Sequence, residues 1–357
     1  MANSRLPVGD DGPVSDVYLH VGPVKTGSTY LQSTMWNSRA ALREQGVLLP
    51  ATHPNEFFLA ANDVQGGRFV LVDIPDAKGA WAKVAARARS WPGRVLITCE
   101  LLGFSEPDHV QRIASSLAPA NLHLIVMARC RADLLPSVYQ EAVKMVDPDQ
   151  SWADFLLGCR GSHQAWRHTT PGTILRRWLP HIPPQRVHVV TVPRRPADPD
   201  RLRQRFAQAL SIDDSRLTTA DAAAANTSLG AVGVELLRAV TARTSGRLDR
   251  SAQRYLINQH LVPLLRELDR PRRPLQLPAS FWPLMSEAAA RDMEAITAAR
   301  CHVHGDLDDL LPASEAFQDD QEASHQVSQT DVLNEAIDAL VTITQTFPPA
   351  ARAPDTE

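Results

Sequence analysis

The segment from Gly22 to Thr29, with the sequence GPVKTGST, gathers residue types that hold phosphates in many proteins: glycines, a lysine and hydroxyls. It follows the apolar run Asp16–Val21 and precedes a stretch of helical periodicity from Ser28 to about Glu44. At such a strand-to-helix junction, loop N–H groups and the positive end of the helix stabilise an anion without much basic charge. The segment therefore predicts a site for phosphate or a related anion.

The position of the lysine separates this loop from the loop of NTPases. In the NTPase pattern GxxxxGK[ST], the lysine follows the second glycine and reaches the β- and γ-phosphates of the nucleotide. Here Ser28 fills that position, and Lys25 lies two residues before Gly27. A lysine at this place suits a shorter group near a 5′-phosphate, such as a 5′-phosphosulfate. The alternative is a plain strand-to-helix turn, in which the glycine serves the backbone and the hydroxyls cap the helix.

Short apolar runs predict buried parallel strands, because near-continuous hydrophobicity is typical of strands covered on both faces. These runs are Asp16–Val21, Arg94–Thr98, Leu122–Met127 and Val187–Val192. The helical segments between and after them are Gly79–Ser90, Pro107–Leu117, Leu134–Met145 and Asp200–Leu210. This alternation predicts an α/β fold with a P-loop-like, doubly wound parallel sheet flanked by helices.

The chain changes character after residue 225, because no strand pattern is found beyond Asn226. Helical patterns cover Ser228–Arg243, Ser251–Leu268 and Phe281–Arg300, and one last helix is expected over Asp331–Gln345. The predicted organisation has four parts: a flexible N-terminus over residues 1–15, an α/β core over 16–225, a C-terminal helical subdomain over 226–315 that completes the same domain, and a linker, possible helix and disordered tail over 316–357.

Composition excludes several classes of partner. Lys and Arg number 37 against 40 Asp and Glu, so the formal net charge of −3 argues against binding to nucleic acid or to an anionic membrane, and any anion site must be built locally. The four cysteines have no CxxC or zinc-site spacing, and the N-terminus lacks a signal-peptide pattern. We expect a cytoplasmic protein with reduced cysteines. Scarce lysine beside abundant Arg, Ala and Pro indicates a GC-rich bacterial genome.

The segment Leu19–Gln32, LHVGPVKTGSTYLQ, resembles the 5′-phosphosulfate loop of sulfotransferases that use 3′-phosphoadenosine 5′-phosphosulfate (PAPS), particularly a bacterial group with the pattern HxGxPKTGTTxLQ. The likeness runs from about Val17 to Pro312 through the segments REQGVLLP, CELLG, ARxRADLLPSVYQE and GDLDDLLP. The chain departs from the family in two places, with Val24 where a proline is usual and Cys99 where a histidine is frequent. Neither change removes a phosphate ligand.

The resemblance implies which loop residues hold the 5′-phosphosulfate: Lys25, Thr26, Gly27, Ser28 and Thr29. Lys25 would also stabilise the charge that develops on the bridging oxygen as the bond breaks. Sulfuryl transfer needs in-line geometry and a neutralised leaving group, which a fixed cation supplies, and no metal is expected. The sulfuryl acceptor would be a hydroxyl, less readily an amine, of a small molecule, natural product or carbohydrate, and 3′-phosphoadenosine 5′-phosphate (PAP) would be the product.

A second implied site binds the 3′-phosphate. The family has an arginine at the end of a strand and a serine eight residues later, and Arg129 and Ser137 have that spacing. A guanidinium at the carboxyl edge of a parallel sheet is well placed for a phosphate. The alternative is an ion pair of Arg129 with a neighbouring carboxylate such as Asp133, with Ser137 solvated in its helix.

Glu100 is the candidate general base, because it follows a predicted strand at the sheet edge that carries the loop and Arg129. The alternative roles are a turn cap or an ion pair. Cys99 is expected to be a buried filler, and His20, inside an apolar strand, is assigned no role. Tyr30 either contacts adenine or packs in the core.

Two other functions compete with this interpretation. A P-loop nucleotide kinase or NTPase shares the loop, but its lysine would stand elsewhere. A protein of the same fold that binds PAPS or another nucleotide without catalysis would also keep the loop. The sequence carries no code for the acceptor or for the oligomeric state.

Overall fold

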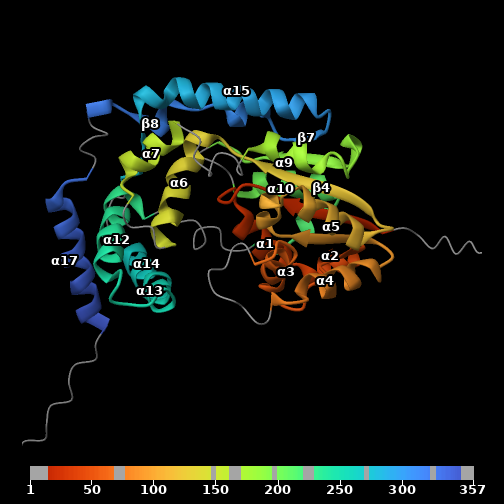
Figure 1. Ribbon diagram of the computed structural model, residues 1–357, viewed down its shortest axis with the longest axis horizontal. Helices are drawn as coiled ribbons and strands as arrows, with labels where there is room; N and C mark the ends of the chain where they lie inside the picture. The colour runs from red at the N-terminus through yellow and green to blue at the C-terminus, as the bar shows by residue number, and fades with distance from the viewer. Residues whose placement is uncertain are drawn as a thin grey trace, which may run out of the picture. The chain divides into compact units, whose positions relative to one another are not determined.

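The computed structural model describes residues 15–67, 77–145, 150–160, 170–194, 199–219, 229–268, 273–321 and 327–346. The chain forms two compact units (Figure 1). Unit one contains residues 1–131, 162–225 and 286–311, and unit two contains residues 132–161, 226–285 and 312–357. The boundaries fall at the start of helix α6 (Arg131–Lys144) and within helix α15 (Trp282–Ala298). Residues 1–14 and 347–357, which were expected to be flexible, lie outside the described residues.

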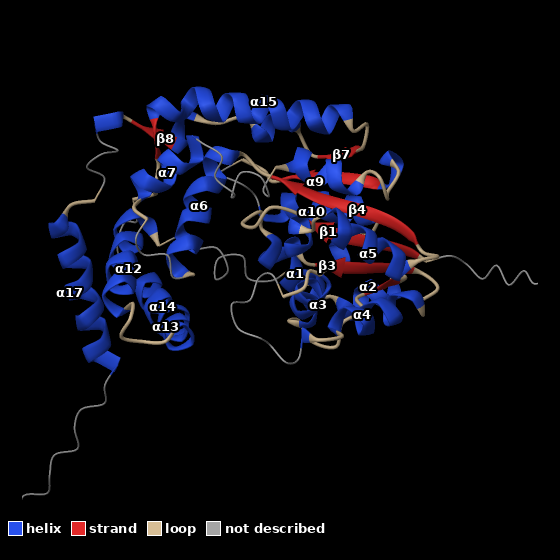
Figure 2. Ribbon diagram, in the orientation of Figure 1, coloured by secondary structure: helices blue, strands red, loops and turns tan. Residues whose placement is uncertain are grey.

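A parallel sheet is the centre of unit one (Figure 2). Its strands are β1 (Asp16–Val21), β2 (Val47–Leu48), β3 (Arg94–Thr98), β4 (Asn121–Ala128), β5 (Val187–Thr191) and β7 (His302–His304). They lie in the order β2-β3-β1-β4-β5-β7, and all their pairings are parallel. The four apolar runs of the sequence are thus four strands of this sheet, and the predicted P-loop-like α/β fold is confirmed.

Helices cover both faces of the sheet, as Figure 2 shows. They are α1 (Ser28–Asn37), α2 (Arg39–Glu44), α3 (Glu56–Val64), α4 (Ala80–Arg89), α5 (Pro107–Leu117), α9 (Pro171–Trp178) and α10 (Pro199–Leu210). From β1 the chain passes through α1 and α2 toward β2, whereas α5 connects β3 to β4 in the opposite direction along the sheet. Because parallel crossovers are right-handed, these two connections run over opposite faces. Short 3-10 helices complete the unit: Glu100–Phe104, Pro184–Arg186, Asp214–Arg216 and Leu307–Leu310.

The expected single helix from Ser28 to Glu44 is two helices. Ser38 separates α1 from α2, and its hydroxyl accepts a hydrogen bond of 2.8 Å from the backbone N–H of Thr218. This tertiary contact is made with a residue far away in the sequence. Helical periodicity could therefore not reveal the break.

Strand β7 corrects the expectation that no strand follows Asn226. Its three residues, His-Val-His, pair with β5 at the edge of the sheet. The segment has no apolar run, because both histidines face the same side and Val303 is exposed. Two further two-residue strands, β6 (Leu277–Pro278) and β8 (Phe317–Gln318), pair with each other in unit two, and β8 lies in the stretch interpreted as a linker.

Unit two is mainly helical. It contains most of α6, together with α7 (Trp152–Arg160), α12 (Gly230–Thr244), α13 (Arg250–Leu256), a π-helical turn (Ile257–Leu261), α14 (Val262–Glu267), 3-10 turns at Ala279–Phe281 and Ser314–Ala316, and α17 (Gln329–Thr346). The helical patterns expected after residue 226 are confirmed within a few residues. Tyr139 of α6 is buried against Trp152 and Phe155, at ring-centroid distances of 5.1 and 5.3 Å. Such aromatic contacts bury much apolar area per residue and anchor the unit.

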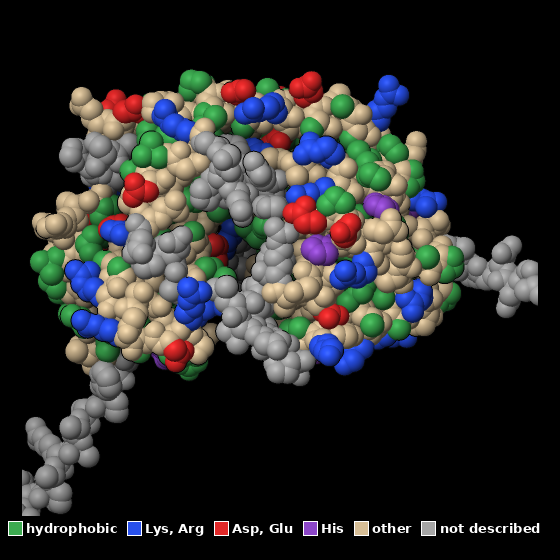
Figure 3. Space-filling view, in the orientation of Figure 1, with side chains coloured by type: hydrophobic (Ala, Val, Ile, Leu, Met, Phe, Trp, Pro, Cys, Tyr) green, Lys and Arg blue, Asp and Glu red, His purple; other side chains and the backbone are tan. Residues whose placement is uncertain are grey.

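Charged side chains of both signs are interspersed over the described surface visible in Figure 3, in keeping with the small net charge. Within the described ranges, no helix is both long and apolar enough to cross a membrane.

A row of aromatic and imidazole rings crosses four strands of the unit-one sheet. Tyr18 of β1 stacks on His123 of β4 with ring centroids 4.4 Å apart. His123 Nδ1 lies 3.5 Å from His188 Nε2 on β5, and His188 Nδ1 lies 3.1 Å from His304 Nε2 on β7. Burial, followed by the neighbouring histidines, lowers the pKa of His188 to about 4. Burial also lowers the pKa of His123 and of His304.

We expect this row to make the protein sensitive to acid. A histidine in the unfolded chain has a pKa of about 6.5, whereas the buried histidines of the folded row have lower pKa values. Between about pH 7 and pH 4 the unfolded chain therefore binds more protons than the folded chain. The free energy of unfolding falls as the pH is lowered through this range. The melting temperature should drop by about 5 °C or more from pH 7.5 to pH 5. His188→Phe keeps a ring but cannot be protonated, and should lose less over the same interval. An equal loss in both proteins would assign the acid sensitivity to other groups.

Candidate active site

The loop between β1 and α1 has the backbone of an anion site. Lys25 and Gly27 adopt left-handed conformations, with φ of 66° and 83°, and Thr26 stands between them. The buried Thr26 donates a hydrogen bond of 3.0 Å from its hydroxyl to the carbonyl of Pro23, which fixes the turn. In turns of this kind, successive N–H groups can point toward one concave side, which binds anions. A non-glycine residue such as Lys25 adopts this conformation at a cost in free energy, and such strain gathers at functional sites.

The N-terminus of α1 adds to this site. No side chain caps it, and its first turn carries no acidic residue. The first N–H groups of a helix have no partner within the helix and carry a partial positive charge. Ser28 opens the helix and is buried. The predicted order of strand, loop and helix is confirmed, and the binding of an anion by this loop stays a prediction.

Close backbone packing brings the end of β3 to this loop. The Gly22 N–H donates a 3.3 Å hydrogen bond to the carbonyl of Glu100. A Cβ on Gly103 would lie 2.6 Å from the Gly22 carbonyl oxygen, so a larger residue at position 103 would push the two segments apart. Gly103, to which the sequence analysis gave no role, thus places Glu100 beside the loop.

Arg129 follows β4 directly, and its guanidinium donates a hydrogen bond to the backbone carbonyl of Lys25. The structure therefore brings the Arg129 side chain to the backbone of the loop that carries Lys25. Arg131, two residues on, forms a buried bidentate pair with Asp292 of α15, with both hydrogen bonds at 2.8 Å. This pair holds the chain where it leaves the strand, close to Arg129.

Ser137 lies on α6 in unit two, and its hydroxyl is 3.5 Å from the carbonyl of Asp133. A serine bonded to the preceding turn is common in helices. Its proposed joint role with Arg129 stays a prediction.

Glu100 begins the 3-10 helix after β3, at the edge where the loop and Arg129 lie. The Gln32 side-chain amide donates a 2.7 Å hydrogen bond to its Oε2 atom. Among the described residues Glu100 has no ion pair, and its role as the base stays a prediction. Gln32 was part of the recognised motif but had no assigned role. It lies one turn after Ser28 on the same face of α1, and from there its side chain reaches Glu100.

Cys99, next to Glu100, is buried as expected of a filler. Burial, and then the charge of Glu100, raise the pKa of its thiol, so the thiol stays protonated at neutral pH. His20 is fully buried, with Nδ1 2.8 Å from the Thr98 hydroxyl, and Tyr30 belongs to the hydrophobic core. The core alternative for Tyr30 is thus the one observed.

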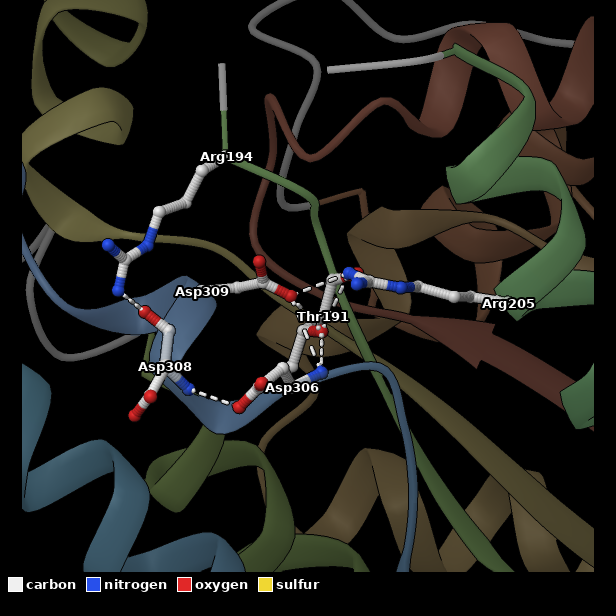
Figure 4. A network of polar contacts seen from close by, with 6 residues as sticks. All are labelled: Thr191, Arg194, Arg205, Asp306, Asp308 and Asp309. Carbon is white, nitrogen blue, oxygen red and sulfur yellow. Dashed lines mark hydrogen bonds and ion pairs between the residues drawn. The ribbon is translucent and has the colours of Figure 1, made fainter. Parts of the chain in front are cut away.

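A polar network joins the end of β5 to the segment that follows β7 (Figure 4). Thr191, at the end of β5, donates a 2.8 Å hydrogen bond to Asp309, and Arg205 of α10 contacts the same carboxylate at 2.6 Å. A Cβ on Gly305 would overlap the Thr191 hydroxyl, so the glycine permits this approach. The segment GDLDDLLP, which is part of the family resemblance, therefore anchors the end of β5. Just after this strand, the Arg194 side chain donates a hydrogen bond to the backbone carbonyl of Asp308.

No protein-family model matches this chain, and no curated protein matches it. A solved structure of a sulfotransferase from Alicyclobacillus acidocaldarius is similar, with 15% sequence identity over 66% of this chain and 98% of that chain, and a TM-score of 0.36. The functional interpretation rests on the residues of the site rather than on this likeness.

Proposed function

We propose that this protein is a PAPS-dependent sulfotransferase that transfers the sulfuryl group to a hydroxyl of a small organic acceptor, with PAP as the second product. One observation carries the proposal: the anion loop, Arg129 and Glu100 meet at one edge of the sheet, with Arg129 bonded to the loop itself. We expect the enzyme to act in the cytoplasm, since its four cysteines are free.

The residues at this edge fit the nucleotide. The loop from Lys25 to Thr29 and the uncapped start of α1 would hold the 5′-phosphosulfate, and Arg129 the 3′-phosphate. The nucleotide supplies the sulfuryl group when it is bound. The lysine stands inside the loop rather than after it, and this placement favours a 5′-phosphosulfate over a triphosphate.

The proposed chemistry assigns one task to each side chain. Glu100 accepts the proton of the acceptor hydroxyl while the acceptor oxygen forms the new bond to sulfur. Lys25 stabilises the negative charge on the oxygen whose bond to sulfur breaks. Gln32 holds Oε2 of Glu100, which orients the carboxylate and leaves Oε1 to take the proton.

Calorimetric titration with PAP, with ADP and with ATP plus Mg²⁺ tests the proposal. The wild type should bind PAP without metal, and Arg129→Ala should weaken PAP binding by about 10- to 100-fold, because a lost charge-assisted contact to the 3′-phosphate costs about 1.5–3 kcal/mol. ADP, which has no 3′-phosphate, should lose less, because only the hydrogen bond of Arg129 to the Lys25 carbonyl is lost. Arg216→Ala is the matched control, since Arg216 pairs with Glu44 on the surface. Preference for ATP with Mg²⁺, or PAP binding that is indifferent to Arg129, would favour the kinase alternative.

A further inference from the structure

A pocket of about 310 Å³ lies beside Glu100 in unit one. Helix α1 lines one side with Gln32 and Trp36, and α3 lines another with Phe57 and Phe58. Glu100 itself is part of the wall. A molecule in this pocket would therefore contact the candidate base directly.

The pocket is almost without charge. Among the described residues that line it, Glu100 is the only charged one, and the other polar side chains are neutral. Arg39 does not line the pocket, although its guanidinium lies over the Trp36 ring, 3.9 Å from the centroid. A carboxylate, phosphate or sulfate on the acceptor would meet repulsion from Glu100 and no cation among the described lining residues. The described lining thus selects an uncharged molecule.

Flat apolar side chains form much of the wall. Phe57 is buried and belongs to the core, so it gives the pocket a rigid back. Phe58 is 36% exposed, so its ring is accessible to a molecule in the pocket. Trp36 adds a third ring, and Leu49 and Leu101 add aliphatic surface. Aromatic walls of this kind bind flat apolar molecules by stacking and by burying area.

The volume indicates the size of the part of the molecule that the pocket can hold. An engineered cavity of about 150 Å³ holds one benzene ring in another protein. A pocket of about 310 Å³ has twice that space. It has room for a body of about two rings and lies at the small end of ligand sites in general.

We propose that the sulfuryl acceptor is an uncharged hydroxy compound with a flat apolar body of about two rings, its hydroxyl directed at Glu100. The sulfation of this compound depends on the proposed function, but its binding in the pocket does not. It excludes acidic and already sulfated sugars as preferred acceptors, which the sequence left open.

Two probes that differ in one charge test the proposal: 2-naphthol and 6-hydroxy-2-naphthoate. Their binding to the protein without nucleotide is measured by calorimetry, and their sulfation is then compared in the presence of PAPS. The wild type should bind 2-naphthol at least about tenfold more tightly than the naphthoate. Phe58→Ala should weaken 2-naphthol binding by about tenfold, while Tyr255→Ala, an exposed aromatic residue of unit two, should not change it.

A charge-introducing variant tests the same point from the other side. Asn55 lines the pocket and is exposed, so Asn55→Arg should fit and shift the preference toward the naphthoate. Equal or tighter binding of the naphthoate by the wild type, or binding of neither probe, would overturn the inference. If the naphthol preference holds but PAP does not bind, the proposed reaction fails and the pocket assignment stands. If PAP binds but the naphthol preference is absent, the pocket assignment fails and the proposed reaction stands.

Discussion

Replacing Lys25 with alanine should lower kcat for sulfuryl transfer by about 100- to 1,000-fold. The side chain starts from a left-handed residue in the loop between β1 and α1, the loop that would hold the 5′-phosphosulfate. A preorganised cation stabilises charge that develops in the transition state more than charge present in the ground state, so kcat should fall more than PAP affinity. Steady-state kinetics with PAPS and a neutral acceptor measure this loss.

The matched control is Lys83→Ala. Lys83 lies exposed on α4, and its loss should leave kcat within about twofold of the wild type, because exposed surface substitutions have small effects. Lys25→Arg separates charge from geometry: it keeps a cation but changes its shape, and it should recover only part of the activity. Lys25→Ala turnover within tenfold of the wild type would remove Lys25 from the chemistry.

Replacing Glu100 with glutamine should lower kcat by about 100- to 10,000-fold, because the amide cannot take the proton of the acceptor. Glutamine has nearly the same shape and can still bond to Gln32, so the pocket and the binding of 2-naphthol should stay unchanged. Kinetics and calorimetry on the same variant separate the two effects. Glu44→Gln is the control, since Glu44 is an exposed partner of Arg216.

The acidity of the acceptor provides a stricter test of Glu100 as the general base. A more acidic phenol needs less help from a base, so the loss in Glu100→Gln should shrink as the acceptor becomes more acidic. A loss of the same size for every acceptor would give Glu100 a positioning role instead.

Local sequence determined much of what could be predicted. The strand Asp16–Val21, the loop after it and the helix Pro107–Leu117 have the expected bounds, because apolar runs, a positive-φ glycine and a proline in the first turn act within a few residues. Arg129 and Glu100 were placed correctly for a similar reason. Each follows a buried strand, and parallel strands bring their carboxyl ends to one edge.

Contacts between distant residues explain what the sequence could not reveal. Gln32 holds Glu100 from 68 positions away, and Thr191 meets Asp309 across 118 positions. Strand β7 has three residues without an apolar run, and only its pairing with β5 makes it a strand. These features arise from tertiary packing, which overrides local propensity.

The most direct measurement of the central claim is chromatographic detection of products after the wild type is incubated with PAPS and 2-naphthol in a chelating buffer. The account predicts equal amounts of PAP and naphthyl sulfate, and their loss in Lys25→Ala. The account would be contradicted if PAPS stayed intact with both neutral and anionic acceptors and the protein transferred phosphate from ATP with Mg²⁺.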